Sequence, residues 1–257
     1  MRTAIHQPDL KQINFLDSRF YTFNGVEFFP SVTTILDVYP KGFGFNQWLK
    51  DVGSNATEIA ERSAKIGSLV HNVTEMLNAG EEITWVNEQG QCLYTQHEWE
   101  LILRFADFWT KCNPELISNE ESFCSKALGF GGTLDRVVVL NGKRWLIDIK
   151  TSNYIHTSHE LQISAYAVLW NEFNPTIPIH ETAILWLKAN TRTDKIDVEK
   201  EIYQGTSNAG AWQLKKFDRH YLDAYEVFKH TQAIWSEENP RFVPLNYTLP
   251  DRIKLVP

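Results

Sequence analysis

The chain has few cysteines, and their arrangement argues against the usual cysteine-based sites. Only Cys92, Cys112 and Cys124 occur in 257 residues, and no two of them form a CxxC pair. A disulfide framework and a structural zinc site are therefore not expected. An iron–sulfur cluster with four cysteine ligands cannot form within one such chain. The composition predicts a protein whose thiols stay reduced.

Long apolar segments are missing as well. No run approaches the roughly 20 residues that a membrane-spanning helix needs. The first residues, MRTAIHQPDLKQ, contain no apolar stretch of the kind found in leader peptides, and the acidic residues Asp9 and Asp17 are unusual in a transit peptide. We therefore expect a cytoplasmic protein with no membrane partner.

Basic residues are outnumbered by acidic ones, 25 to 32, which gives a formal net charge of -7. This balance argues mildly against a broad basic surface for nucleic acid. It leaves room for local basic patches, because a phosphate needs only a few lysines or arginines nearby. The candidate patches are Lys188/Arg192/Lys195 and Lys215/Lys216/Arg219.

The N-terminal part of the chain shows mainly helical patterns. Residues 19–29 predict a β-hairpin that turns at Asn24-Gly25, and Ser31 is placed to cap a short helix over 32–36. A break rich in Pro and Gly follows at 39–44. Apolar residues at helical spacing then predict helices over 54–79 and 96–111, the second opened by the capping box Thr95-x-x-Glu98.

The C-terminal part changes to alternating strands and helices. Strands are predicted over 122–126, 132–140 and 144–150, and Asn141-Gly142 forms the turn between the last two. A helix over 158–173, strands over 182–188 and 195–203, and a helix over 211–235 follow. The order predicts one α/β domain with a helical N-terminal part and no linker.

Three charged residues converge in the segment GGTLDRVVVLNGKRWLIDIKTS, residues 131–152. Asp135 and Asp148 lie on neighbouring predicted strands, and Lys150 follows Asp148 by two residues, so its side chain points to the same face. Two carboxylates can hold divalent cations, which neutralise developing negative charge and lower the pKa of a bound water. A nearby ammonium can orient that water or stabilise the charge. The group is suited to phosphodiester hydrolysis.

The short pattern [DE]-x-K carries little information alone. A chain with 32 acidic residues gives about two such matches by chance, and two are present, at Asp9 and at Asp148. Only the second closes an apolar strand, where burying charge costs several kcal/mol unless it is paired or bound to metal. A structural pair of Asp148 with Lys150 on an edge strand is the alternative.

Further polar residues occur in an ordered series around this centre. Each has an ordinary structural alternative, such as a packed histidine, a solvated acid or one face of an amphipathic helix. The series comprises Gly67 and His71 four residues apart on a helix, Glu121, Thr151, and Gln162 and Tyr166 four apart on the next helix.

The order G-x-x-x-H, E, G-x-x-D, D-x-K-T and Q-x-x-x-Y resembles that of RecB-type PD-(D/E)XK nucleases. Here it comprises Gly67/His71, Glu121, Gly132/Asp135, Asp148/Lys150/Thr151 and Gln162/Tyr166. The resemblance is clearest over 65–170. It extends weakly to FPSVTTIL (29–36) and Trp48, which are similar to the mitochondrial genome maintenance exonuclease group, and phage recombination exonucleases share the same core. The four cysteines of iron–sulfur relatives and a G-x-x-x-x-G-K-[ST] helicase motif are absent from this sequence.

The resemblance implies a role for each of these residues. His71, Asp135, Asp148 and the backbone carbonyl of Ile149 are implied metal ligands for one or two Mg²⁺ or Mn²⁺ ions. Lys150 is the implied catalytic lysine. The remaining implied roles are an accessory acid, Glu121, and substrate-positioning residues, Thr151, Gln162 and Tyr166.

The resemblance also implies a fold and a function. The fold is a restriction-endonuclease-like core, a mixed central β-sheet flanked by helices, over 116–257, after a mainly helical part over 1–115. The function is a metal-dependent exonuclease acting on ends of single-stranded DNA in recombination, repair or replication, in a bacterial or phage-infected host cell, with a recombination or annealing protein as a further partner. The alternatives are a structure-specific endonuclease and a non-catalytic DNA-binding protein. The aromatic residues Phe43, Phe45, Trp48 and Trp212 are candidates for base stacking, with core packing as the alternative.

Overall fold

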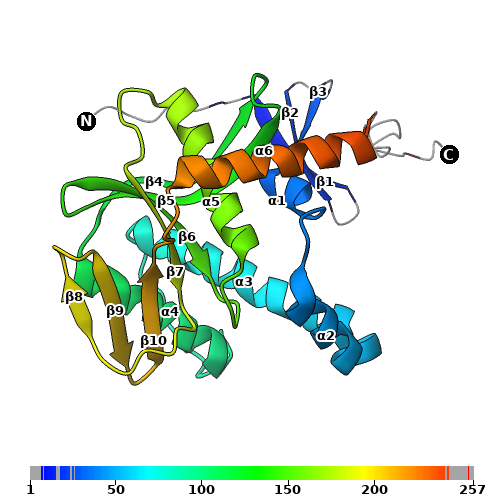
Figure 1. Ribbon diagram of the computed structural model, residues 1–257. Helices are drawn as coiled ribbons and strands as arrows, with labels where there is room; N and C mark the ends of the chain where they lie inside the picture. Colours follow the sequence, from blue (N-terminus) through cyan, green and yellow to red (C-terminus); the bar gives the residue numbers. More distant parts are fainter. Residues whose placement is uncertain are drawn as a thin grey trace.

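A computed structural model describes residues 7, 9–15, 18–23, 25, 27–240, 242 and 254. The fold is mixed α/β and is built around a large sheet with helices on both faces (Figure 1). This sheet has seven strands in the order β4-β5-β6-β7-β10-β9-β8. Their bounds are β4 Glu115–Ser125, β5 Phe130–Leu140, β6 Lys143–Lys150, β7 Glu181–Trp186, β8 Lys195–Asp197, β9 Ile202–Ser207 and β10 Gly210–Lys215.

The centre of the sheet follows the sequence prediction closely. Strands β5 and β6 form an antiparallel hairpin, and Asn141 and Gly142 at its turn have φ values of 51° and 75°. Two successive positive φ values are typical of a two-residue hairpin turn. Strand β7 then pairs parallel to β6, which requires a crossover connection. Helix α5, Thr157–Phe173, makes this connection in the predicted place.

Helices cover the two faces of the sheet, and alternation along β6 divides its side chains between them. Leu146 belongs to the core that contains α5, α6 (Tyr221–Glu238) and the short helix α1 (Val32–Leu36). Trp145 and Ile147 belong to the opposite core, with α3 (Ala56–Asn78) and α4 (Gln96–Cys112). A strand with apolar residues on both faces lies in the middle of a layered domain, and β6 is such a strand.

A small three-stranded sheet precedes these helices. Its strands β1 (Leu10–Phe15), β2 (Ser18–Phe23) and β3 (Glu27–Pro30) pair in order. The predicted hairpin over 19–29 is confirmed as β2–β3. Of its turn, Gly25 has φ 67° and Asn24 lies outside the described residues. The side chain of Ser31 caps α1 by accepting the N–H of Thr34 at 3.0 Å, as predicted. Strand β1 was not predicted, because its alternation is mostly polar.

The two long N-terminal helices occupy the expected ranges. The Thr95/Glu98 capping box is present at the start of α4. Helix α2 (Gly42–Val52) begins inside the predicted break and leads through a short turn, η1 (Gly53–Asn55), into α3. The first turns of α3 extend beyond the sheet, as Figure 1 shows. Ile59 on these turns is 43% exposed, although its helical spacing with Ile66 and Val70 predicts the buried face.

One C-terminal prediction is wrong. The helix expected over 211–235 begins only at Tyr221, because 210–215 form β10. Trp212 and Leu214, two residues apart, both belong to the core of the sheet. In so short a segment, this spacing does not distinguish a strand from a helix. Trp212 is fully buried and its Nε1 donates to Asp107 at 2.7 Å, which excludes it as a base-stacking residue. The strand expected over 195–203 is divided into β8 and β9.

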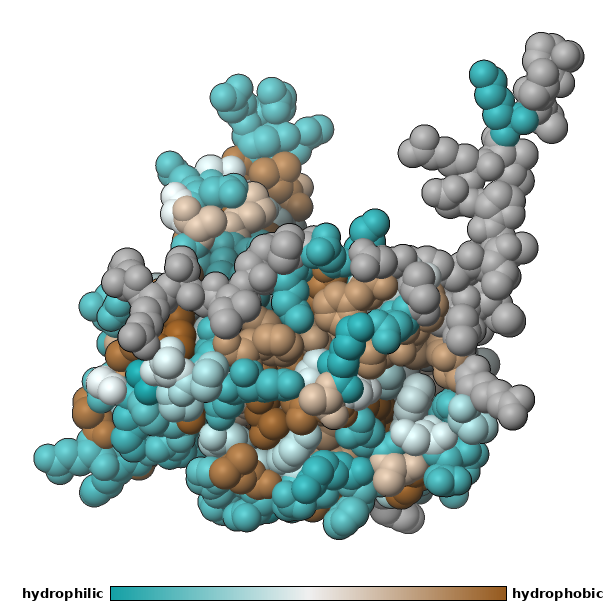
Figure 2. Space-filling model, turned by 90° about the horizontal axis from the view of Figure 1, so that it is seen from above, coloured by the Kyte–Doolittle hydropathy of each residue, from teal (hydrophilic) through white to brown (hydrophobic). Residues whose placement is uncertain are grey.

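Among the described residues, no helix is both long and apolar enough to cross a bilayer. Figure 2 shows the side of the molecule that lies uppermost in Figure 1. Brown apolar residues and teal hydrophilic residues are interspersed on it in small patches.

Candidate active site

The site forms where two central strands diverge. Pairing between β5 and β6 ends at Arg136 and Ile147, whereas β6 continues along β7 as far as Lys150 and Trp186. The carboxylate of Asp135 lies in the opening, where its Oδ2 accepts the N–H of Ile149 at 2.7 Å. The hairpin therefore brings Asp135 beside the end of β6, as the sequence predicts.

A group able to hold a metal ion lies at this opening. Its members are His71 from α3, Glu120 from β4 and Asp135 from β5, and their ligand atoms all lie within 4.8 Å of one another. His71 Nδ1 is 3.3 Å from Glu120 Oε1 and 3.5 Å from Asp135 Oδ2. The other ring nitrogen, Nε2, lies 3.1 Å from the carbonyl oxygen of Ile149. The imidazole thus faces three oxygen atoms that are possible ligands of a cation.

The pKa of His71 reflects these neighbours. Burial alone would lower it, but the negative charges of Asp135 and Glu120 outweigh burial and raise the pKa to about 9. Without a metal, the ring is therefore protonated at neutral pH, and both nitrogens donate toward oxygen. A divalent cation would take the place of such a proton, because a histidine ligand must be neutral.

Asp148 and Lys150 complete the charged centre from the last residues of β6. Asp148 is 1% exposed, and burial raises its pKa to about 6, although the ammonium of Lys150 opposes the shift. Lys150 Nζ lies 2.7 Å from Asp148 Oδ2 and forms an ion pair with this buried oxygen. The charge of Asp135 acts on the same carboxylate and raises its pKa further. Two acidic groups this close together are a donor set that suits a divalent cation.

Helix α5 places two polar residues against Asp148. Gln162 Nε2 donates to Asp148 Oδ1 at 3.3 Å and to the hydroxyl of Tyr166 at 3.1 Å. The ring of Tyr166 lies so close to Gly132 that a Cβ there would be 2.4 Å from Cε1. Only glycine permits this approach. Burial raises the pKa of Tyr166 well above its usual value, so the phenol stays neutral.

Glu120 takes the place that the sequence analysis gave to Glu121. Successive residues of a strand point to different sides, so only one of the two can face His71. Glu121 instead accepts a hydrogen bond from Ser118 Oγ at 2.7 Å. The local backbone is irregular, since Glu120 has φ 49° and the pairing of β4 with β5 shifts between Leu116 and Ser118. That shift cannot be read from the sequence, and it decides which acid points inward.

A buried arginine holds Glu120 in place. Arg136 is 1% exposed, and its Nη1 donates to Glu120 Oε1 at 2.9 Å. The same guanidinium donates to Asn78 Oδ1 at 2.6 Å and to Thr74 Oγ1 at 3.0 Å, both on α3. Arg136 therefore connects the helix that carries His71 with the strand that carries Glu120. The sequence analysis did not identify either Glu120 or Arg136.

The other predicted residues lie at the edges of this centre. Thr151 follows Lys150 and lies beside α3, its Oγ1 3.6 Å from the position a Cβ of Gly67 would take. Phe45 and Trp48 lie together on α2 with ring centroids 5.6 Å apart, and Phe45 is exposed. The side chain of Phe43 lies outside the described residues.

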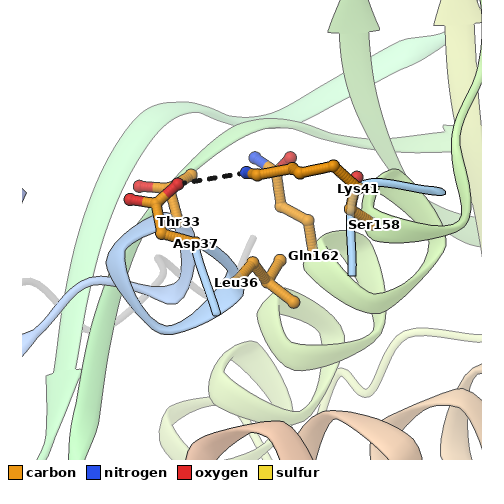
Figure 3. Close-up of a pocket in the computed structure, with 6 residues that line it drawn as sticks. All are labelled: Thr33, Leu36, Asp37, Lys41, Ser158 and Gln162. Carbon is orange, nitrogen blue, oxygen red and sulfur yellow. Dashed lines mark hydrogen bonds and ion pairs between the residues drawn. The ribbon is translucent and has the colours of Figure 1, made fainter. Parts of the chain in front are cut away.

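Two hollows flank the centre. One, of about 160 Å³, lies between α1 and the start of α5 and is lined by Thr33, Leu36, Asp37, Lys41, Ser158 and Gln162 (Figure 3). The second, of about 470 Å³, is lined by Gln7, Leu10 and residues 118–122, which include Glu120. Gln162 borders the first hollow and bonds Asp148, and Glu120 borders the second and faces His71. Each hollow thus shares one lining residue with the centre.

No protein-family model and no curated protein matches the chain. The chemistry of the site is therefore the basis for inferring its function.

Proposed function

We propose that the chain is a metal-dependent DNA nuclease of the PD-(D/E)XK type, which hydrolyses phosphodiester bonds from the ends of single-stranded DNA. The observation that supports this proposal best is the convergence of Asp135, Asp148 and Lys150 at the end of β6. His71 lies 3.1 Å from the carbonyl of Ile149 at the same place. Carboxylates, a carbonyl and an imidazole around a lysine form a donor set for a hydrolytic metal.

Each residue has a defined task in this proposal. Asp135, Asp148, Glu120, His71 and the Ile149 carbonyl would hold one or two divalent cations. When bound, such a cation supplies positive charge for the phosphate and lowers the pKa of a water.

Lys150 acts beside these ligands. Its pKa is raised, because the nearby carboxylates of Asp148 and Asp135 outweigh the opposing effect of burial. The side chain is therefore an ammonium at neutral pH. It orients the attacking water or stabilises the charge that develops on the phosphate oxygens. Acting as a general base toward that water would require the neutral amine, so orienting the water or stabilising charge suits its protonation better.

The metal is proposed to be Mg²⁺ or Mn²⁺. The oxygen donors suit both ions, and the imidazole of His71 favours Mn²⁺. Restoring a chelated protein with each metal separately, and measuring the rate against metal concentration, compares the two.

The preference for a free single strand rests on how enclosed the centre is. Asp135 and Asp148 are both buried, and the elements that carry their partners, α3 and α5, lie on opposite faces of the sheet. A duplex is stiff, with a persistence length of about 150 bp, whereas a single strand bends easily into a narrow opening. We therefore propose that a strand enters by its end.

Digestion of labelled DNA tests both parts of the proposal. Linear and circular single strands and a linear duplex are incubated with Mg²⁺, with Mn²⁺ or with a chelator. The proposal expects metal-dependent loss of the linear single strand and survival of the circle. Rapid cutting of the circle would identify an endonuclease. Binding without cleavage in either metal would identify a non-catalytic DNA-binding protein.

A further inference from the structure

The two basic patches of the sequence differ in the structure. In the Lys215/Lys216/Arg219 patch, Lys216 Nζ lies 2.7 Å from Glu181 and also contacts Glu201, and Arg219 pairs with Glu160. The charges of Lys216 and Arg219 are therefore neutralised within the protein. In the part of the chain that the structure describes, only Lys215 of this patch is without an ion pair.

Lys188 in the other patch has a different environment. It is half-buried just beyond the end of β7, and its Nζ donates to the side chain of Asn153 at 3.4 Å. Among the described residues, no carboxylate lies within ion-pair distance of Lys188. Its charged neighbour is Arg104, and burial together with that positive charge lowers the pKa of Lys188. An anion placed here would relieve the repulsion between the two cations.

The position of Lys188 connects it to the active site. Lys150 and Trp186 are partners in the parallel pairing of β6 with β7, and the N–H of Leu187 donates to the carbonyl of Lys150 at 2.9 Å. Lys188 therefore lies two residues beyond the level of the catalytic lysine, just after the end of the adjacent strand β7. A phosphate next to the one that is cleaved lies within reach of such a position.

Tyr154 lies on the loop that leaves the same end of β6, and the residue is 71% exposed. The loop itself is held by hydrogen bonds, because Trp186 Nε1 donates to the carbonyl of Ser152 and Ser152 Oγ donates to the carbonyl of Tyr154, both at 2.8 Å. Lys188 bonds the residue between them, Asn153. The loop backbone is thus held in place, and it carries an exposed aromatic residue next to Asn153, the residue that Lys188 contacts.

We infer that Tyr154 and Lys188 bind the part of a single DNA strand that extends beyond the cleaved bond. The ring of Tyr154 stacks on an unpaired base, and the ammonium of Lys188 bonds a backbone phosphate. Stacking needs an exposed base face, which a single strand offers and a duplex does not. This inference rests on the proposed nuclease function, and it adds the surface that guides the substrate.

Fluorescence anisotropy of a labelled oligothymidylate tests the inference. The full chain is used with a chelator present, so that binding is measured apart from cleavage. Tyr154→Ala is expected to weaken binding about tenfold, in the range that removal of one stacked base gives, and Tyr154→Phe to keep it. Lys188→Gln is expected to lower the slope of log affinity against log salt by about 0.7, the value for one phosphate contact on a single strand.

Lys200→Gln is the matched control. This lysine is 71% exposed on the turn between β8 and β9, at the far edge of the sheet, so its removal changes the net charge equally. Thermal unfolding checks that each variant is folded. Equal affinities for the wild type, Tyr154→Ala and Lys188→Gln would overturn the inference, as would a loss in Lys200→Gln as large as that in Lys188→Gln. A duplex that binds more tightly than the single strand and is equally sensitive to Tyr154→Ala would also overturn it.

The two proposals fail in different ways. Normal cleavage with unchanged binding in both variants would refute only the path over Tyr154 and Lys188. Binding that depends on both residues without cleavage in any metal would refute only the nuclease chemistry.

Discussion

Replacing Glu120 and Glu121 separately by glutamine distinguishes two neighbouring acids that the sequence cannot tell apart. Glu120 Oε1 lies 3.3 Å from His71 Nδ1 and 2.9 Å from Arg136 Nη1, whereas Glu121 accepts from Ser118. Glu120→Gln should therefore weaken metal binding, and Glu121→Gln should leave it near the wild-type value. The two substitutions are chemically identical, so each serves as the control for the other.

The magnitude follows from what Glu120 contacts. Truncation to alanine would leave the buried guanidinium of Arg136 without its anion, at a cost of about 3–5 kcal/mol. Glutamine keeps an oxygen that can accept from Arg136, so we expect a loss of only about 1–2 kcal/mol in unfolding free energy. The lost carboxylate should weaken the metal at least about tenfold, the lower end of the effect of removing even an indirect partner of a ligand.

Isothermal titration calorimetry of the metal-free proteins with Mn²⁺ measures the affinities. The pKa of His71, followed by NMR, adds a second readout. Glu120 is one of the two carboxylates that raise this pKa, so it should fall in Glu120→Gln. Equal Mn²⁺ affinities in the two variants, or a larger loss in Glu121→Gln, would refute the assignment of Glu120.

Two further perturbations act on other parts of the site. In the metal-free protein, the folded-state pKa values of His71 (about 9) and Asp148 (about 6) both lie above their usual values, so both groups stabilise the fold when protonated. For His71 this contribution to stability is complete below about pH 6.5 and is lost as pH rises through 9. Denaturant unfolding should therefore show a loss of up to about 3 kcal/mol in unfolding free energy between those pH values. Added Mn²⁺ should reverse this loss, and an unfolding free energy that does not change with pH in the metal-free protein would contradict the charge assignment. Gly132→Ala should displace the ring of Tyr166, destabilise the fold by about 1–3 kcal/mol and impair cleavage. Gly44→Ala is the control, because a Cβ at Gly44 on the exposed helix α2 would meet no atom within 4 Å, and it should be neutral or slightly stabilising. Equal melting temperatures for the two alanine variants would contradict the close contact between Gly132 and Tyr166.

The sequence was informative where local chemistry determines the structure. Asn141-Gly142 specifies a hairpin turn, and the hairpin brings Asp135 next to Asp148 without information from distant residues. The Thr95/Glu98 box marks the start of α4 in the same way. For this reason the centre of the sheet and the positions of its charged residues could be predicted together.

Properties that depend on distant contacts could not be predicted. Which of Glu120 and Glu121 faces His71 depends on an irregularity in the pairing of β4 with β5. Trp212 fits a helix or a strand equally well until β7 is placed beside it. The role of Arg136 requires Thr74, Asn78 and Glu120 to be brought together from two elements.

Measuring metal binding and DNA cleavage in the same Lys150→Ala protein tests the central claim most directly. Lys150 lies 2.7 Å from Asp148, yet it offers no ligand atom to a cation. The claim predicts that Lys150→Ala still binds Mn²⁺ and that its cleavage of linear single-stranded DNA falls about 100-fold or more. Cleavage at the wild-type rate by this variant, or by the wild type in the presence of a chelator, would contradict it.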